Sequence, residues 1–347
     1  MKAPLLLAAP LLLIACTAPE ARETTPPAAS AGEVNVYSHR HYDSDKILFA
    51  RFTELTGIQV NLLSAGDDDL LARIEAEGAN TPGDVLITAD AGRLGSAKQR
   101  GLFQNVTSEV LNTNIPADRR DPDGAWFGFS MRARVFAYNK EKVKPEELRD
   151  YADITLPKFK GRVLARSSEH VYNQSLVASF IAHDGQAAAQ QWCSGVVRNF
   201  ARDPKGSDTD QMLAIAEGIG DVAIVNSYYA GKLLSSDDPA KAEARRLIAV
   251  AFPDNKGHGT HVNVSGGGVI QHAKNKANAI KLLEFLSSDE AQRVFAENNL
   301  EFPVKPGVPA AAILQGFGTF KADTLDLSLL STNNAEAVKT LTAAGWR

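Results

Sequence analysis

The chain has 347 residues, of which 44% are hydrophobic and 22% are charged, and its formal net charge is −4. At roughly 100–200 residues per domain, this length predicts two domains with packed cores, and the composition excludes a largely disordered chain. The charged residues form no basic block, so nucleic acid is not an expected partner.

The N-terminal segment has the pattern of an export signal. Lys2 is followed by an uncharged, Leu-rich run from Ala3 to Ala15. This run is shorter than the ~20 residues that span a bilayer, and it predicts a signal peptide over residues 1–15. Leu13-Ile14-Ala15-Cys16 resembles the lipobox of bacterial lipoproteins, which predicts that Cys16 is lipidated. The alternative is ordinary cleavage nearby with an incidental cysteine.

A tether and a first group of alternating elements follow. Residues 17–32 are rich in Ala, Thr and Pro, so we expect residues 16–32 to form a lipid anchor and flexible linker. Hydrophobic periodicity then predicts alternating strands and helices, typical of parallel βαβ units. The strands are expected at 33–38, 58–63 and 84–88, and the helices at 43–56, 67–77 and 91–100.

The rest of the chain repeats this alternation. Strands are expected at 134–138, 161–165, 221–226, 247–252 and 262–271, and helices at 174–183, 186–200, 210–218, 276–286, 288–298 and 335–344. The pattern predicts an α/β fold of two lobes, each a mixed sheet flanked by helices, around a ligand cleft. We place lobe 1 at 33–130 plus 260–305 and lobe 2 at 131–259 plus 306–347, with crossings near 125–135 and 253–262. We expect a monomer.

Common catalytic motifs are absent. Gly218–Ala223 fits GxGxxA but follows a helix and precedes a strand, the reverse of a dinucleotide fingerprint, and Ser265 is not in a GxSxG elbow. His258 and His261 lie in a Gly-rich segment that favours a loop over a metal pair. Cys193 has no partner for an internal disulfide and is expected to be a buried hydrophobe. The sequence therefore does not predict an enzyme.

Four of the seven tyrosines follow predicted strands. Tyr42 follows the first strand, Tyr172 follows the strand at 161–165 by a short loop, and Tyr228 and Tyr229 follow the strand at 221–226. They therefore lie at the strand ends where open α/β sheets bind ligands. Such tyrosines are compatible with aromatic packing, a stacking platform for sugars, or metal binding through phenolate oxygen.

Phenolate is a hard anionic donor, and it suits hard cations. A free tyrosine has a pKa of about 10, so the cation must be acidic enough to displace a proton at neutral pH. Fe³⁺ meets this requirement better than Zn²⁺, Mg²⁺ or Ca²⁺. The imidazole of His41, beside Tyr42, also suits iron.

Several segments resemble bacterial periplasmic ferric-ion-binding proteins, the substrate-binding proteins of iron(III) ABC importers, and above all their cyanobacterial type. These segments are YSHRHYDSD (37–45), RSSEHVYNQSLVAS (166–179), NSYYAGKLL (226–234) and GTHVNVSGGGV (259–269). The resemblance implies a type II, Venus-flytrap binding-protein fold. It also implies Fe³⁺ as the transported ligand, held by His41, Tyr42, Tyr172, Tyr228 and Tyr229.

The resemblance also implies how the site is completed. Four phenolates leave one net negative charge on Fe³⁺, which an arginine would offset. Arg40, Arg132 and Ser168 are candidates for this role or for holding a carbonate-like anion; a water molecule is the alternative. His39 replaces the serine that relatives often carry, either as an outer neighbour or as a competing ligand.

The implied partners are an ABC permease and, through the lipid, a membrane. The implied location is the periplasm or the outer face of the cytoplasmic membrane. Three other interpretations stay open: a binding protein of the same fold for an anion, sugar or polyamine, a secreted enzyme, and an adhesion or stress lipoprotein.

Overall fold

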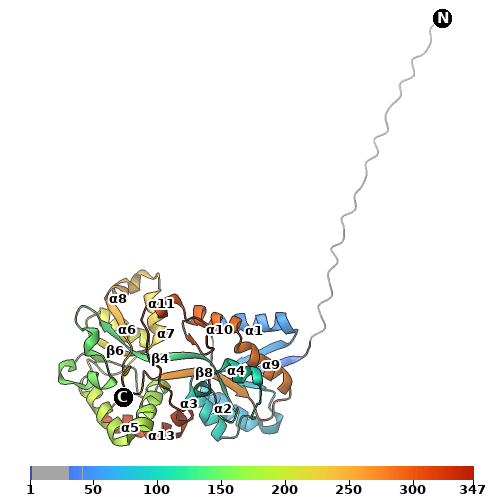
Figure 1. Cartoon of the computed structure of the whole chain (residues 1–347), viewed down its shortest axis with the longest axis horizontal. Helices are drawn as coiled ribbons and strands as arrows, with labels where there is room; N and C mark the ends of the chain where they lie inside the picture. The colour runs from blue at the N-terminus through green and yellow to red at the C-terminus, as the bar shows by residue number, and fades with distance from the viewer. Residues whose placement is uncertain (2–30, 41) are drawn as a thin grey trace.

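The computed structural model describes Met1, residues 31–40 and residues 42–347, apart from the side chain of Asp67. Cys16, the signal peptide and His41 lie outside the described residues. The chain forms two lobes that are joined by long strands (Figure 1). No helix of the described part is long and apolar enough to cross a membrane.

The first lobe is built on strands β2, β1 and β3, which are parallel, and on β8, which pairs antiparallel with β3. Strand β3 is buried along its whole length because helices cover both faces of the sheet. The strands are β1 (Glu33–Ser38), β2 (Gln59–Ser64), β3 (Val85–Thr88) and β8 (Val262–Val269); the helices are α1 (Asp43–Thr56), α2 (Asp67–Glu77), α3 (Ala91–Gln99), α4 (Glu109–Asn114), α9 (Lys276–Leu286) and α10 (Asp289–Val294).

The second lobe contains parallel β5 and β6, with β6 and β7 antiparallel to β4. Helix α5 is interrupted at Gly185, where φ is 82° and ψ is 167°, which agrees with the two helices predicted there. The elements are β5 (Val163–Leu164), β6 (Val222–Asn226), β7 (Ile248–Ala251), α5 (Val171–Arg198), α6 (Asp208–Ala216), α7 (Ser227–Leu234) and α8 (Ala242–Leu247).

The C-terminal segment lies along both lobes. Helix α11 packs on α7, α13 packs on α5, and α12 contacts both α3 and α5. These helices are α11 (Ala312–Gln315), α12 (Ser328–Thr332) and α13 (Asn334–Ala344). Short helical turns occupy Gly78–Asn80, Ala117–Arg119, Pro145–Glu147, Tyr151–Thr155, Pro157–Phe159, Pro239–Lys241 and Phe295–Asn299.

Strand β4 (Phe127–Asn139) connects the lobes. Its first half pairs with β8, and its second half pairs with β6 and β7. The short strand β9 (Phe302–Pro303) pairs with β4 at Ser130 and Met131. The sequence predicted only residues 134–138 of this strand. The second crossing lies in β8, just after the predicted region at 253–262.

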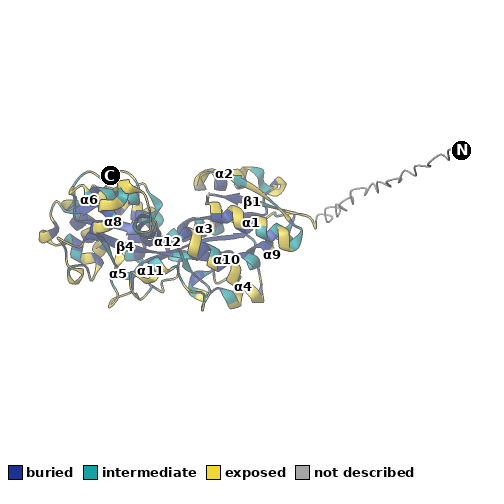
Figure 2. Ribbon diagram, turned by 90° about the horizontal axis from the view of Figure 1, so that it is seen from above, coloured by how far each residue is buried: buried dark blue, intermediate teal, exposed yellow. Residues whose placement is uncertain are grey.

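The buried side chains form one extensive core and a smaller one in the second lobe, between β4, α6 and α7. In Figure 2 most of the strands are buried and the outer helix faces are exposed, whereas the edge strand β2 is largely exposed. Backbones approach closely where β8 enters the first lobe. A Cβ atom on Gly266 or Gly268 would collide with the carbonyl oxygens of Phe127 and Ala125, so these positions require glycine.

Candidate metal centre

Four tyrosines converge between the lobes, and each lies where a helix begins. Tyr42 is the residue before α1, Tyr172 is in the first turn of α5, and Tyr228 and Tyr229 are in the first turn of α7. Their positions after strands agree with the sequence prediction. The sequence also predicts loops at these positions. This holds for Tyr42 but is wrong for the other three, because α7 begins directly after β6 and α5 begins one residue before Tyr172.

The phenol groups contact one another. The hydroxyl oxygens of Tyr172 and Tyr228 share a hydrogen bond at 3.0 Å. The rings of Tyr228 and Tyr229 are tilted by 31° with centroids 4.3 Å apart. Tyr42, from the first lobe, lies close enough to Tyr228 to raise the pKa of that phenol by its charge. The structure therefore gathers phenols from both lobes around one point.

Burial governs the protonation of these tyrosines. It raises the pKa of Tyr42 above its usual value, and the negative charge of Glu301 adds to this effect. Burial likewise raises the pKa values of Tyr172 and Tyr228, which stay raised although Arg132 opposes the shift at Tyr172. These three groups are consequently neutral phenols in the empty site at neutral pH. A ligand that binds their oxygens as anions must displace their protons.

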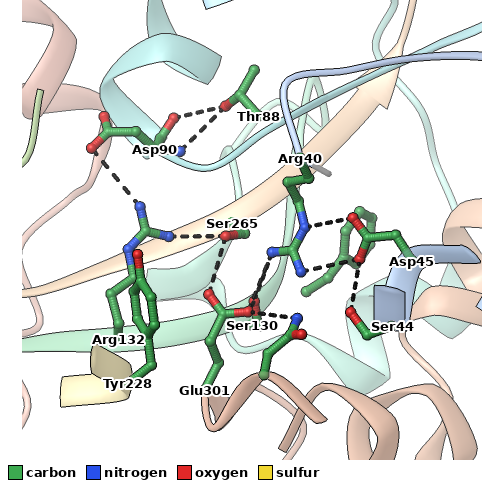
Figure 3. A network of polar contacts seen from close by, with 12 residues as sticks. Arg40, Ser44, Asp45, Thr88, Asp90, Ser130, Arg132, Tyr228, Ser265 and Glu301 are labelled. Carbon is green, nitrogen blue, oxygen red and sulfur yellow. Dashed lines mark hydrogen bonds and ion pairs between the residues drawn. The ribbon is translucent and has the colours of Figure 1, made fainter. Parts of the chain in front are cut away.

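Arg40 is fixed beside Tyr42 by two carboxylates. Its guanidinium lies 3.0 Å from Asp45 and 3.3 Å from Glu301, and all three side chains are buried (Figure 3). Burial would lower the pKa of Arg40, but the charges of Asp45 and Glu301 raise it further above its usual value. The guanidinium carbon is 4.8 Å from the centroid of the Tyr42 ring. Arg40 is therefore a permanent cation at the edge of the phenol cluster.

Arg132 occupies a similar position on β4. It donates a hydrogen bond to Ser265 at 3.1 Å and lies 3.9 Å from the carboxylate of Asp90. Figure 3 shows Arg132 next to Tyr228, and its guanidinium is 5.8 Å from the centroid of the Tyr172 ring. One of its terminal nitrogens is buried without a hydrogen-bond partner in the described part of the chain. This nitrogen is available to an anion or to a phenolate.

Ser168 is less directly involved than predicted. Its backbone N–H donates to the carbonyl of Arg347 at 3.2 Å, and its carbonyl accepts from Gln174 at 3.1 Å. Its hydroxyl has no hydrogen bond within the described residues. The structure therefore supports Arg40 and Arg132 as neighbours of the tyrosines more strongly than Ser168.

Sequence reasoning missed three further charged neighbours. Lys232 is an exposed residue that lies 5.0 Å from the Tyr42 ring and 5.6 Å from the Tyr228 ring, and partial desolvation lowers the pKa of its ammonium group. Arg134 and Arg166 lie 5.8 Å and 5.5 Å from the Tyr172 ring. Lys232 is four residues after Tyr228, so a helix prediction for 227–234 would have placed both side chains on one face.

The remaining predicted residues have clear positions where the structure describes them. His39 lines a hollow of about 420 Å³ together with His170 and Tyr172. Cys193 is fully buried, as predicted, and burial raises the pKa of its thiol to about 12. In the described part of the chain, no three His, Cys, Asp or Glu side chains are arranged to hold a metal ion.

Comparison with known proteins identifies the family. The bacterial extracellular solute-binding protein family matches residues 80–315. Iron uptake protein A1 of Synechocystis sp. is 51% identical over 315 residues, which cover 91% of this chain and 88% of that protein. The chain belongs to the bacterial extracellular solute-binding proteins. Members of this family bind a solute and are not enzymes.

A solved structure and a more distant relative support the same assignment. Trichodesmium IdiA (FutA) in complex with iron and citrate ligands is 49% identical, with a TM-score of 0.88 over 91% of this chain and all of the other. The major ferric iron-binding protein of Neisseria meningitidis is 26% identical over 91% of this chain and 93% of its own length. The fold of this solute-binding protein is thus the two-lobed periplasmic binding-protein fold expected from its sequence, with a mixed sheet and flanking helices.

Proposed function

We propose that this solute-binding protein binds Fe³⁺ between its lobes and delivers it to the permease of an ABC importer. The ligands are the phenolate oxygens of Tyr42, Tyr172, Tyr228 and Tyr229 and the imidazole of His41. A water molecule or a carbonate-like anion beside Arg132 completes the coordination. The residue boundaries of the two lobes predicted from the sequence belong to this proposal.

One observation carries the proposal. The hydroxyl oxygens of Tyr172 and Tyr228 are 3.0 Å apart, and Tyr42 from the other lobe lies close enough to raise the pKa of the same Tyr228. A contact of this kind between buried phenols places several hard oxygen donors around one position. In support, the chain is similar over nine-tenths of its length to an iron uptake protein and to a protein solved in complex with iron and citrate ligands.

The charges near the site fit an iron–phenolate centre. Four phenolates and one Fe³⁺ have a net charge of −1. Arg132 and Lys232 lie beside the tyrosines and offset it, whereas the charge of Arg40 is already met by Asp45 and Glu301. The raised pKa values select for a strongly acidic cation, because a weaker Lewis acid cannot replace the phenol protons at neutral pH.

The arrangement suggests an order of events. Tyr172, Tyr228 and Tyr229 belong to the second lobe, so iron first meets these three oxygens. Closure of the lobes through β4 and β8 then adds Tyr42 and His41. The closed protein docks on the permease, and lipid on Cys16 keeps the exported protein at the membrane.

Absorption spectroscopy tests the iron site. Purified soluble protein, residues 33–347, should develop a broad visible phenolate-to-iron charge-transfer band with ferric citrate. Tyr228→Phe and Tyr172→Phe should lose most of this band. Tyr37→Phe is the matched control, because Tyr37 is a tyrosine of the first lobe whose hydroxyl is bonded to Glu77. A band that persists unchanged in both cleft variants would refute the ligand assignment.

The alternative ligand is an anion, sugar or polyamine bound by the same cleft. In that case no charge-transfer band would form, and iron would pass separately from the protein through a desalting column. The fold would stand, and the tyrosines would act by stacking and hydrogen bonding.

A further inference from the structure

A second cavity lies away from the tyrosines, at the segments that connect the lobes. Its volume is about 380 Å³, within the usual range for small-molecule sites. Helix α5, the turn at Tyr151, the segment from Asp254 to His261 and Asp323 form its walls. On α5, His183 is eleven residues after Tyr172, which corresponds to about 16 Å along the helix axis.

Aromatic side chains form one wall of this hinge cavity. Phe180 packs edge-on against Tyr151, with centroids 5.1 Å apart, and against Trp192 at 4.7 Å. The indole N–H of Trp192 donates to the carbonyl of Tyr151 at 2.8 Å, which fixes the orientation of the ring. The wall therefore offers preorganised aromatic rings, which attract cations through their faces.

The lining is also acidic. Four aspartates line the cavity, and among the described residues no lysine or arginine does: Asp150, Asp184, Asp254 and Asp323. Two of them contact histidines, since Asp323 is 2.8 Å from His183 and Asp184 is 3.3 Å from His258. The rings of these two histidines are stacked, with centroids 4.0 Å apart.

The carboxylate of Asp254 can still pair with a cation, because it has no ion-pair partner within the described residues. The backbone φ of Asp254 is 62°, in the left-handed region. Burial raises the pKa of Asp254, and although His258 opposes this shift, the negative charges of Asp150 and Asp184 add to it. The cavity thus holds negative charge that the protein itself does not neutralise.

His261 supplies an independent indication of a ligand. Its side chain lines the cavity and is only 4% exposed, yet neither ring nitrogen has a hydrogen-bond partner among the described residues. Burial lowers the pKa of His261 to about 3, so the imidazole is neutral at physiological pH and can accept an N–H hydrogen bond. The unpaired ring nitrogens reach the space of the cavity, so water or a ligand there satisfies them.

We propose that this hinge cavity is a second binding site, for a small organic cation that carries an ammonium or guanidinium group. The aromatic wall would hold the cation by cation–π contact, Asp254 and Asp184 would pair with its charge, and His261 would accept one of its N–H groups. Because the walls come from the connecting segments and α5, the site is separate from the tyrosine cluster.

Isothermal titration calorimetry of the purified full chain with agmatine tests this site. Agmatine carries both an ammonium and a guanidinium group, and it should bind saturably at one site. Asp254→Asn and Asp184→Asn should each weaken binding about tenfold or more. Asp237→Asn, an exposed aspartate that does not line the cavity, is the matched control and should leave binding unchanged. Tyr228→Phe should also leave it unchanged, which separates this site from the cleft.

Three outcomes would overturn the proposal. One is the absence of saturable heat with the unsubstituted chain up to about 10 mM agmatine. Another is unaltered binding by both Asp254→Asn and Asp184→Asn in protein whose circular dichroism shows a native fold. The third is loss of binding in Tyr228→Phe, which would place the cation in the cleft. None of these results bears on the charge-transfer band, so the iron proposal is tested independently.

Discussion

The hydroxyl of Ser175 lies 3.0 and 3.1 Å from the two carboxylate oxygens of Asp90, and this contact joins the lobes. Ser175 is three residues after Tyr172 in α5, and Asp90 caps the N-terminus of α3 in the first lobe. Both side chains are buried, and Asn263 of β8 donates to the same carboxylate at 2.8 Å. The contact thus holds α5 and its tyrosine against the first lobe.

Ser175→Ala should favour the open arrangement of the lobes. The substitution removes a hydrogen bond to a buried carboxylate, a type of bond worth about 1.5–3 kcal/mol. Part of this loss destabilises the closed state and not the open state. Small-angle scattering should therefore give a larger radius of gyration, and iron affinity should fall about tenfold. Ser179→Ala is the control, since that buried hydroxyl bonds only within α5, to Leu176. Equal scattering and affinity in both variants would contradict this role.

Iron binding should release protons, because each phenol loses one when it becomes a ligand. The raised pKa values of Tyr172 and Tyr228 mean that both are protonated beforehand at neutral pH. In a pH-stat titration with one ferric citrate stock, Tyr172→Phe should release about one proton fewer per iron than the unsubstituted protein. Tyr37→Phe should release the same number as the unsubstituted protein. If Tyr172→Phe also does so, the oxygen of Tyr172 is not a ligand.

Lys232→Gln should weaken iron binding. The ammonium group lies near the rings of Tyr42 and Tyr228, where it offsets the charge of their phenolates. Competition against citrate should show a loss of about tenfold, with Lys232→Arg recovering most of the affinity because it retains the charge. The exposed Lys339 provides the control variant Lys339→Gln. A loss of the same size in Lys232→Arg would point to packing instead of charge.

The buried imidazole of His261 should make the free energy of unfolding depend on pH. Its pKa is lowered to about 3 in the folded protein, whereas an unfolded histidine titrates near 6.5. Below about pH 6.5 the unfolded state therefore binds the extra proton, and stability present above this pH is lost as the pH falls toward 3. The free energy of unfolding, measured with urea, should fall between pH 7.0 and pH 5.5. This fall should be about 1 kcal/mol smaller in His261→Gln than in the unsubstituted protein. An unchanged difference would show that this histidine does not contribute.

Local pattern was sufficient for much of the fold. The helices at 43–56, 67–77 and 276–286 were predicted at the bounds that the structure has, because their apolar spacing and flanking glycine or polar residues define them. Strand β4 was underestimated, since glycine, serine and arginine interrupt the apolar pattern of residues 127–132. These residues become buried only through pairing with β8, a long-range contact that periodicity does not contain.

The candidate site was also partly predictable from local sequence pattern. The rule that ligands gather at the carboxyl ends of strands placed four tyrosines together, and the structure brings them into contact. The charged partners of the site could not be predicted from the sequence. Glu301 is distant from Arg40 in the sequence, and Ser175 is distant from Asp90, so only the folded chain shows that each pair meets.

The starting points of three helices at the phenol cluster have one more consequence. Helix α1 begins after Tyr42 and α7 begins just before Tyr228, and neither has a side-chain cap on its first turn. Their free N–H groups carry partial positive charge, which favours anionic oxygen nearby. The main chain therefore supplies part of the positive charge that compensates the ionised tyrosines. Loss of one arginine or lysine would therefore reduce this compensation without removing it.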